Sequence, residues 1–138
     1  MPAELFLDTS GWFPALATWH SLHSLHVAAL REALHEGLRP VTTNLVVVET
    51  HALLLRRAGR GPALAFLREV RRSLTVTVSS TPEVEERALR DWIERYDDHD
   101  ISLTDAVSFA VMAERGIEEA LALDHHFRVA GFRTRPAG

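Results

Sequence analysis

The sequence of 138 residues contains no cysteine and no lysine, and each absence excludes a class of chemistry. Without cysteine there is no disulfide framework, no thiolate zinc site and no cysteine nucleophile. All fifteen basic residues are arginines, so Schiff-base catalysis and the lysine of a phosphate-binding P-loop are both excluded. No stretch approaches the roughly 18 apolar residues of a membrane-spanning helix, and the first ten residues lack the basic segment of a signal peptide. We therefore expect a cytoplasmic protein with no membrane partner.

Composition and charge indicate one globular domain with an uneven charge distribution. Hydrophobic residues make up 46% of the chain, and its length suits a single core, so we interpret residues 1–138 as one domain. The formal net charge is -4 at pH 7, whereas nucleic-acid-binding surfaces are usually basic. However, residues 56–72 hold six arginines against one glutamate, and residues 83–105 hold nine acids against three arginines. The chain thus has one basic and one acidic segment.

Apolar segments of strand length alternate with segments of helical periodicity. We expect strands at residues 4–7, 39–43, 75–79 and 120–123, with an edge strand at 132–135. Helices are expected at residues 10–18, 21–36, 44–57 and 102–115, with two more beginning at 61 and 81. Strands separated by helices form parallel sheets that are covered on both faces. The pattern predicts an α/β fold: a single three-layer α/β/α domain with a mostly parallel sheet of four to five strands.

Two aspartates stand at the predicted carboxyl ends of strands. Asp8 directly follows the apolar segment ELFL, and Asp124 directly follows ALAL. Open α/β sheets bind ligands at this edge, and if the two strands are neighbours, about 4.8 Å apart, the two carboxylates can share one ion. Either aspartate alone is equally well explained as the cap of the next helix or turn. The two together favour a binding site.

Two further acids fall on predicted helices. Glu49 lies inside the apolar sequence LVVVETHALLL, where a carboxylate needs a cation, an arginine partner or the wet rim of the core. Asp105 ends the sequence Ser102-Leu103-Thr104-Asp105, which resembles a capping box, and taken alone this favours a capping role. For Asp105 the capping role and a site role are compatible, because a helix start projects its first-turn side chains toward the carboxyl edge of the sheet. Glu49 also emerges at this edge, because its helix follows the second predicted strand.

Four clustered carboxylates require either protonation or a cation. Oxygen ligands favour hard ions such as Mg²⁺ or Mn²⁺, and such ions can activate water and stabilise the charge on a phosphodiester in nucleases and polymerases. An alternative is a phosphotransferase or phosphatase whose first aspartate is the nucleophile. Enzymes resembling haloacid dehalogenases usually have a second aspartate two residues after the first, and a later lysine. This sequence has neither the second aspartate nor any lysine. Receiver domains also need that lysine, so they are disfavoured for the same reason.

Four segments together resemble the PIN-domain nucleases, and among them the toxins of VapC type. The segments are DTSGWF (8–13), TNLVVVE (43–49), LTDAVSFAVMAERGI (103–117) and ALALDHHFRVAGF (120–132). The resemblance implies that Asp8, Glu49, Asp105 and Asp124 are the catalytic and metal-binding acids, and that Thr9 or Ser10 and Thr104 supply hydroxyls near the metal. Asp100 matches no residue of the family's pattern, and we interpret it as a solvated loop acid.

The resemblance also implies an activity and partners. It predicts an endoribonuclease that uses Mg²⁺ or Mn²⁺ to hydrolyse RNA, forms a homodimer and is inhibited by a small cognate antitoxin protein. Two alternatives stay open: a PIN nuclease that processes RNA without being a toxin, and a PIN-like module that binds RNA or a protein without catalysis. The sequence names neither the RNA target nor the number of ions.

The remaining candidates have competing structural explanations. Arg56, Arg57 and Arg60 in the basic segment could hold an RNA backbone, although a solvated helical face or a dimer contact explains them at least as well. His125 and His126 could touch substrate, although packing in a turn is favoured. Surface or packing roles are expected for the histidines His20, His23 and His26. Core or interface roles are expected for the tryptophans Trp12, Trp19 and Trp92.

Overall fold

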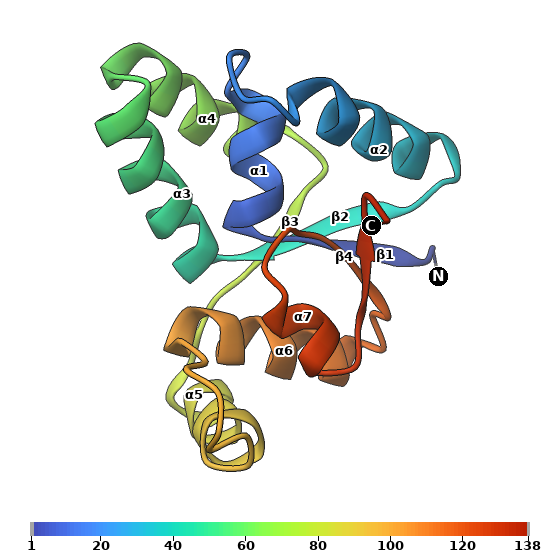
Figure 1. Ribbon diagram of the computed structural model, residues 1–138, viewed down its shortest axis with the longest axis vertical. Helices are drawn as coiled ribbons and strands as arrows, with labels where there is room; N and C mark the ends of the chain where they lie inside the picture. The colour runs from blue at the N-terminus through green and yellow to red at the C-terminus, as the bar shows by residue number, and fades with distance from the viewer. Residues whose placement is uncertain (1, 138) are drawn as a thin grey trace.

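A parallel five-stranded sheet forms the centre of the protein in the computed structural model, which describes residues 2–137 (Figure 1). The elements along the chain are β1 (Glu4–Leu7), α1 (Thr9–Leu16), α2 (His23–His35), β2 (Arg39–Thr43), α3 (Asn44–Arg57), α4 (Arg60–Arg72), β3 (Val76–Val78), α5 (Pro82–Ala88), the π-helical turn η1 (Leu89–Ile93), α6 (Leu103–Arg115), β4 (Glu119–Leu121), α7 (His126–Val129) and β5 (Arg133–Arg135). Of the helices in this part of the chain, none is both long and apolar enough to cross a bilayer.

The sheet has the order β3-β2-β1-β4-β5, and every neighbouring pair is parallel. Helices α1 to α4 cover one face, and α5, α6 and α7 cover the other (Figure 1). The predicted three-layer α/β/α architecture is therefore confirmed. Strand order reverses between β1 and β4, because the chain adds strands first on one side of β1 and then on the other. Such a switch point opens a crevice at the carboxyl ends of the strands.

Side chains at the element boundaries explain where the helices begin and end. Thr43 closes β2 and caps α3 by accepting the Val46 N–H at 3.1 Å. Ser102 caps α6 in the same way through the Asp105 N–H at 3.1 Å. Gly116 ends α6 in the left-handed conformation, with φ of 68°, which glycine adopts without steric cost. These polar caps direct the starts of α3 and α6 toward the carboxyl edge of the sheet.

Apolar side chains on both faces of the sheet form the core. Phe6 and Leu121 are fully buried on the central strands. On the α6 side, Phe109 packs edge-on against Phe127, with ring centroids 4.9 Å apart. Aromatic pairs of this geometry add stabilisation beyond the area they bury. This packing holds α7, and the residues just before it, against α6.

The observed bounds differ from the predicted ones by one or two residues at the ends of several elements. β4 covers Glu119–Leu121 rather than residues 120–123, because the N–H of Leu123 turns to a side-chain acceptor, Ser10 Oγ, at 2.9 Å. Asp124 thus stands three residues beyond the strand and not directly after it. The turn η1 and the four-residue α7 were not predicted. Helix α4 begins at Arg60, one residue earlier than expected.

Candidate metal centre

Three side chains from two separate segments converge at the switch point. Asp105 lies in the first turn of α6, Asp124 lies in the loop after β4, and His126 begins α7. One potential ligand atom from each lies within 4.8 Å of the other two. The Nδ1 atom of His126 is 3.3 Å from Asp124 Oδ1 and 3.8 Å from Asp105 Oδ2. The sequence therefore brings two of its four predicted acids into direct contact with a histidine for which packing was the favoured role.

Asp8 is joined to this group through a serine. The buried Asp8 side chain accepts hydrogen bonds from the Ser10 N–H at 3.1 Å and the Ser10 hydroxyl at 2.6 Å. Ser10 Oγ in turn accepts the backbone N–H groups of Leu123 at 2.9 Å and Asp124 at 3.1 Å. Asp8 thus caps α1, as its alternative interpretation predicted, and also connects β1 to the loop that carries Asp124.

Gly11 allows α1 to approach the end of β4. A Cβ atom at this position would overlap the backbone carbonyl of Leu121 and also meet its side chain. The Asp8 N–H donates to the same carbonyl oxygen at 3.2 Å. Because backbone cannot move aside as a flexible side chain can, only glycine fits here. This close approach holds the Asp8 end of β1 against the end of β4.

Burial and mutual repulsion perturb the acids of this group. Burial raises the pKa of Asp8 to about 6 and outweighs the hydrogen bonds from Ser10, which act to lower it, and the charges of Asp124 and Glu49 raise it further. Burial, a hydrogen bond with Asp124 and the neighbouring charges raise the pKa of Asp105. Burial acts to raise the pKa of Asp124, but hydrogen bonds from the Asp105 carboxyl and the His126 N–H place it below its ordinary value. The three acids therefore resist carrying three negative charges together.

The protein supplies little positive charge to offset these acids. Within residues 2–137, no arginine forms an ion pair with Asp8, Asp105 or Asp124, and the side chains that lie nearest to Asp105 and Asp124 in place of an arginine are the imidazoles of His125 and His126. Buried carboxylates without a cationic partner are costly. Oxygen atoms that converge from three elements without an arginine suit a divalent cation, and these residues therefore fit a metal ion from the hard, oxygen-preferring class.

Glu49 occupies the solvent-exposed rim rather than the centre of the group. It lies on α3, is exposed, and forms no ion pair with an arginine in the described part of the chain. Its charge nevertheless acts on Asp8 and Asp105, raising the pKa of both. Of the three settings expected for this residue, the structure shows the wet rim. The apolar sequence around Glu49 does not bury it, because some of these apolar residues face solvent too. Val48, its neighbour on α3, is 66% exposed.

The three hydroxyl residues separate into different roles. Ser10 is in contact with Asp8, as described above. Thr9 is buried, and its hydroxyl lies 3.0 Å from the hydroxyl of Thr50 and 3.5 Å from the Val46 carbonyl, a contact between α1 and α3. Thr104 is half-buried, and its backbone carbonyl accepts the Ser108 hydroxyl at 2.9 Å. Of these hydroxyls, the one that contacts a predicted acid is that of Ser10.

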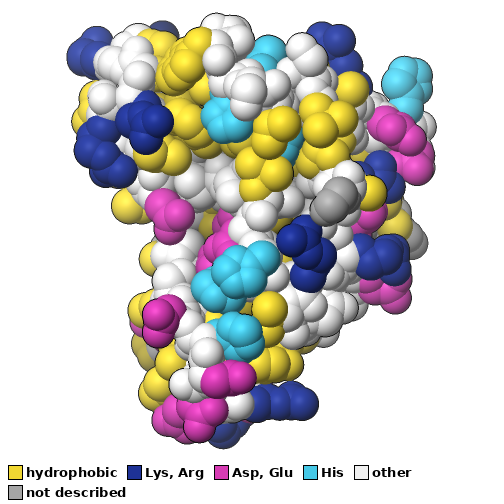
Figure 2. All heavy atoms as spheres, viewed as in Figure 1, with side chains coloured by type: hydrophobic (Ala, Val, Ile, Leu, Met, Phe, Trp, Pro, Cys, Tyr) yellow, Lys and Arg dark blue, Asp and Glu magenta, His cyan; other side chains and the backbone are white. Residues whose placement is uncertain are grey.

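The candidate RNA-binding arginines lie at the exposed junction of α3 and α4. Arg56, Arg57 and Arg60 are all exposed, and no acid of residues 2–137 pairs with them. Figure 2 shows basic side chains gathered over this junction, at the upper left of the face. Because α3 rises about 1.5 Å per residue, Arg57 lies about 12 Å along the helix from Glu49. The basic surface is thus about two helical turns away from Glu49.

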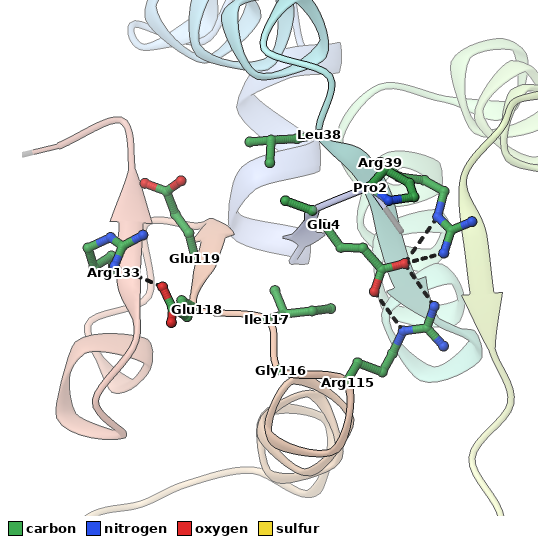
Figure 3. Close-up of a pocket in the computed structure, with 11 residues that line it drawn as sticks. Pro2, Glu4, Leu38, Arg39, Arg115, Gly116, Ile117, Glu118, Glu119 and Arg133 are labelled. Atoms are coloured by element: carbon green, nitrogen blue, oxygen red, sulfur yellow. Dashed lines mark hydrogen bonds and ion pairs between the residues drawn. The ribbon is translucent and has the colours of Figure 1, made fainter.

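A pocket at the opposite edge of the sheet is a structural ion-pair network. There Glu4 accepts hydrogen bonds from Arg39 at 2.6 Å and Arg115 at 2.8 Å, and Glu118 pairs with Arg133 (Figure 3). The side chains face one another across the amino-terminal ends of the strands. Their charges are already mutually neutralised, which lowers the pKa of Glu4 mainly through the Arg115 hydrogen bond. This pocket therefore lacks the uncompensated charge of the carboxylate group.

Comparisons with known proteins give this arrangement a context. The model of the PIN domain matches residues 5–133. The chain is 38% identical over 134 residues to the 23S rRNA-specific endonuclease VapC20 of Mycobacterium tuberculosis, covering 96% of this chain and 98% of the relative. The crystal structure of VapC20, described as a sarcin–ricin-loop-cleaving toxin, superposes with a TM-score of 0.83 at 32% identity, covering 94% and 96% of the two chains. The structure of FitAcB from Neisseria gonorrhoeae has a TM-score of 0.68 at 14% identity, covering 94% and 95%, and shows similarity of fold alone.

Proposed function

Because this chain belongs to the PIN-domain family, we propose that it is a divalent-metal-dependent endoribonuclease, the toxin of a toxin–antitoxin pair, and that residues 1–138 act as one PIN domain. The observation that carries the proposal is the set of buried and half-buried carboxylates at the switch point, which no arginine among residues 2–137 neutralises. A module that only binds RNA or a protein does not need a group of clustered acids, and clustering them lowers the free energy of unfolding. A metal-dependent hydrolase requires one.

Asp8, Asp105 and Asp124 would hold the ion, and Mg²⁺ or Mn²⁺ suits their oxygen atoms. A bound ion of this kind lowers the pKa of a water molecule and stabilises charge that develops on a phosphodiester. The protein's own groups supply the positioning. Ser10 orients Asp8 and the Asp124 loop with one hydroxyl, and Glu49, the fourth predicted acid, would act from the solvent-exposed rim.

His126 is proposed as a positioning residue in this reaction. Its Nδ1 atom lies 3.3 Å from Asp124 Oδ1, and its backbone N–H donates to the same oxygen at 2.9 Å. The two contacts hold the Asp124 carboxylate in one orientation. Neighbours that orient ligand carboxylates in this way contribute strongly to metal affinity.

For the substrate, the similarity to VapC20 makes structured ribosomal RNA the first candidate. Arg56, Arg57 and Arg60 would contact its phosphates, since such contacts position RNA without specifying its sequence. We also propose a small antitoxin partner and a homodimer. Exposed apolar side chains in two loops and on α3 offer surface for such contacts: Trp19, Leu74 and Val48, which are 57%, 87% and 66% exposed.

The test is cleavage of purified ribosomes and of naked structured RNA by the full chain, with and without a chelator. We expect that wild type cleaves RNA, that a chelator abolishes this cleavage, and that added Mg²⁺ or Mn²⁺ restores it. We expect no cleavage by Asp8→Asn. Cleavage that continues in both the chelator and the Asp8→Asn arms would show a different chemistry. Sedimentation or light scattering of the pure chain tests the dimer, and co-purification with the product of an adjacent short gene tests the antitoxin.

A further inference from the structure

Three histidines lie together beside the carboxylates although they come from two distant segments of the chain. His99 lies in the loop that follows η1, whereas His125 and His126 stand at the start of α7. One ring nitrogen of each lies within 4.8 Å of the other two. The rings of His125 and His126 have centroids 4.3 Å apart, and that of His99 is 6.0 Å from His126. Figure 2 shows histidine side chains gathered in the middle of one face, next to acidic ones.

We propose that His99, His125 and His126 form a binding site for a borderline divalent cation, of which Zn²⁺ is the best match. Imidazole nitrogen suits Zn²⁺ and related transition metals, whereas carboxylates and water suit Mg²⁺ and Mn²⁺. Two nitrogens bound to one zinc ion at about 2.1 Å lie at most about 4.2 Å apart. Small side-chain rotations therefore bring the observed nitrogens into a zinc coordination sphere, and His125, with 65% of its side chain exposed, is free to make them.

The hydrogen-bonding state of these rings distinguishes them from the structural histidines of the same chain. Ring nitrogens of His20, His23 and His26 each contact a backbone atom, at 3.0, 2.9 and 3.3 Å. In contrast, the rings of the three-histidine cluster make no hydrogen bond with any group of residues 2–137. Their polar neighbours are carboxylates at 3.3 to 3.9 Å. These rings keep nitrogen lone pairs available for a metal.

Carboxylates beside the cluster complete the features of a transition-metal site. Asp98 Oδ1 lies 3.9 Å from His99 Nε2, and Asp124 Oδ1 lies 3.9 Å from His125 Nδ1. Metal-binding histidines usually donate their second ring N–H to a carboxylate, which fixes the ring and strengthens the ligand. Water or one of these oxygens supplies the fourth position that zinc requires.

The position of His126 in both groups has a consequence for activity, which rests on the proposed function. Because His126 also contacts Asp124 and Asp105, a zinc ion that recruits this ring withdraws it from the carboxylates. Zinc would then inhibit cleavage supported by Mg²⁺ or Mn²⁺. Zinc binding itself does not require that the protein cleave RNA, so failure of one proposal is distinguishable from failure of the other.

The experiment is a titration of the metal-free full chain with Zn²⁺ alone, in competition with a chromophoric chelator. We expect one zinc ion per chain, with affinity at least about tenfold weaker in His99→Ala and in His125→Ala. His35→Ala, an exposed histidine at the end of α2, and Asp8→Asn serve as controls that keep full zinc affinity. Substitution with Co²⁺ gives a second readout, a visible absorption band that the two cluster variants lose.

The proposal is overturned if the wild-type chain binds no zinc, if both cluster variants bind as tightly as wild type, or if Asp8→Asn loses affinity as strongly as they do. The last result would place the zinc ion among the carboxylates. Thermal unfolding of each variant checks its fold, and because His125 is exposed, its replacement is expected to leave the unfolding temperature unchanged.

Discussion

The Ser10 hydroxyl donates a 2.6 Å hydrogen bond to Asp8 and, with the same oxygen, accepts the N–H groups of Leu123 and Asp124. One side chain therefore sets the separation of two acids that lie 116 residues apart in sequence. Its contacts explain why β4 ends before Asp124, and why the acids from β1 and from the loop after β4 meet at one place.

Replacement of this hydroxyl should weaken metal binding without unfolding the protein. We expect Ser10→Ala to lower affinity for Mn²⁺, and metal-supported RNA cleavage, by about 10- to 100-fold, because groups that orient ligand carboxylates contribute on this scale. Ser10→Thr keeps the hydroxyl and should recover most of the affinity. Equal losses in the two variants would show that the hydroxyl is not the group that matters. Isothermal titration with Mn²⁺ makes the comparison.

Gly11 should tolerate no side chain. In Gly11→Ala the new Cβ would overlap the Leu121 carbonyl, and overpacking of this kind typically costs about 1–3 kcal/mol. The matched control is Gly61→Ala in α4, where no atom from outside the local helix lies within 4 Å of the new Cβ. Urea unfolding measures both variants. A Gly11→Ala protein as stable as the Gly61→Ala protein would contradict the close approach of α1 to β4.

The metal-free protein should lose stability between about pH 4 and pH 6. The pKa of Asp8 is raised from 3.8 to about 6 in the folded state, so over this interval the folded protein binds a proton that the unfolded chain has released. Its contribution is fully present below pH 4 and is lost as the pH rises through 6, amounting to up to about 3 kcal/mol. Other groups titrate too, so the quantity to measure is the difference between wild type and Asp8→Asn in unfolding free energy.

That difference should therefore change with pH in one direction. In the absence of metal, Asp8→Asn should become progressively more stable than wild type as pH rises from 4 to 7. Saturating Mg²⁺ or Mn²⁺ should stabilise wild type at pH 7 by mass action and should have a much smaller effect on the variant. A flat difference across this range would contradict the buried setting of the carboxylate.

The arginines at the junction of α3 and α4 should act on RNA affinity rather than on chemistry. For Arg56→Ala, Arg57→Ala and Arg60→Ala we expect a raised KM with an almost unchanged kcat. The slope of log affinity against log salt should fall by about 0.7 for each lost phosphate contact. Arg90→Ala is a control on the opposite layer, where the arginine is already paired with Asp91. A control that weakens RNA binding equally would point to a general effect of charge.

The part of the fold predicted from sequence is the part with strong local signals. The segments 39–43 and 44–57 have their predicted bounds, because Thr43 both ends the strand and caps the helix. Gly116 likewise ends α6 where expected. In contrast, α7 has four residues, too few for a periodic pattern, and its position depends on the packing of Phe127 against Phe109.

The candidate site was predictable in its acids and unpredictable in their surroundings. The positions of Asp8 and Asp105 follow from a strand end and a helix start, which share one edge of the sheet, whereas Asp124 was predicted directly after its strand and stands three residues beyond it. The place of His126 depends on the loop after β4 turning back to Ser10, a contact 113 or more residues away in sequence. The adjacent histidine pair at 125–126, directly after the candidate ligand Asp124, was the available signal. Glu49 reached the solvent-exposed rim because its apolar helix is exposed on one side.

The central claim is that the carboxylates at the switch point bind a divalent ion that supports RNA cleavage. The most direct measurement is anomalous diffraction from crystals soaked in Mn²⁺, of wild type and of Asp105→Asn, with Asp100→Asn as the matched exposed acid. We predict a manganese peak in coordination contact with Asp8, Asp105 and Asp124 in wild type and in Asp100→Asn. In Asp105→Asn we predict that both the manganese peak and RNA cleavage are lost. A wild-type crystal with no peak at these carboxylates, from protein that still cleaves RNA, would contradict the account.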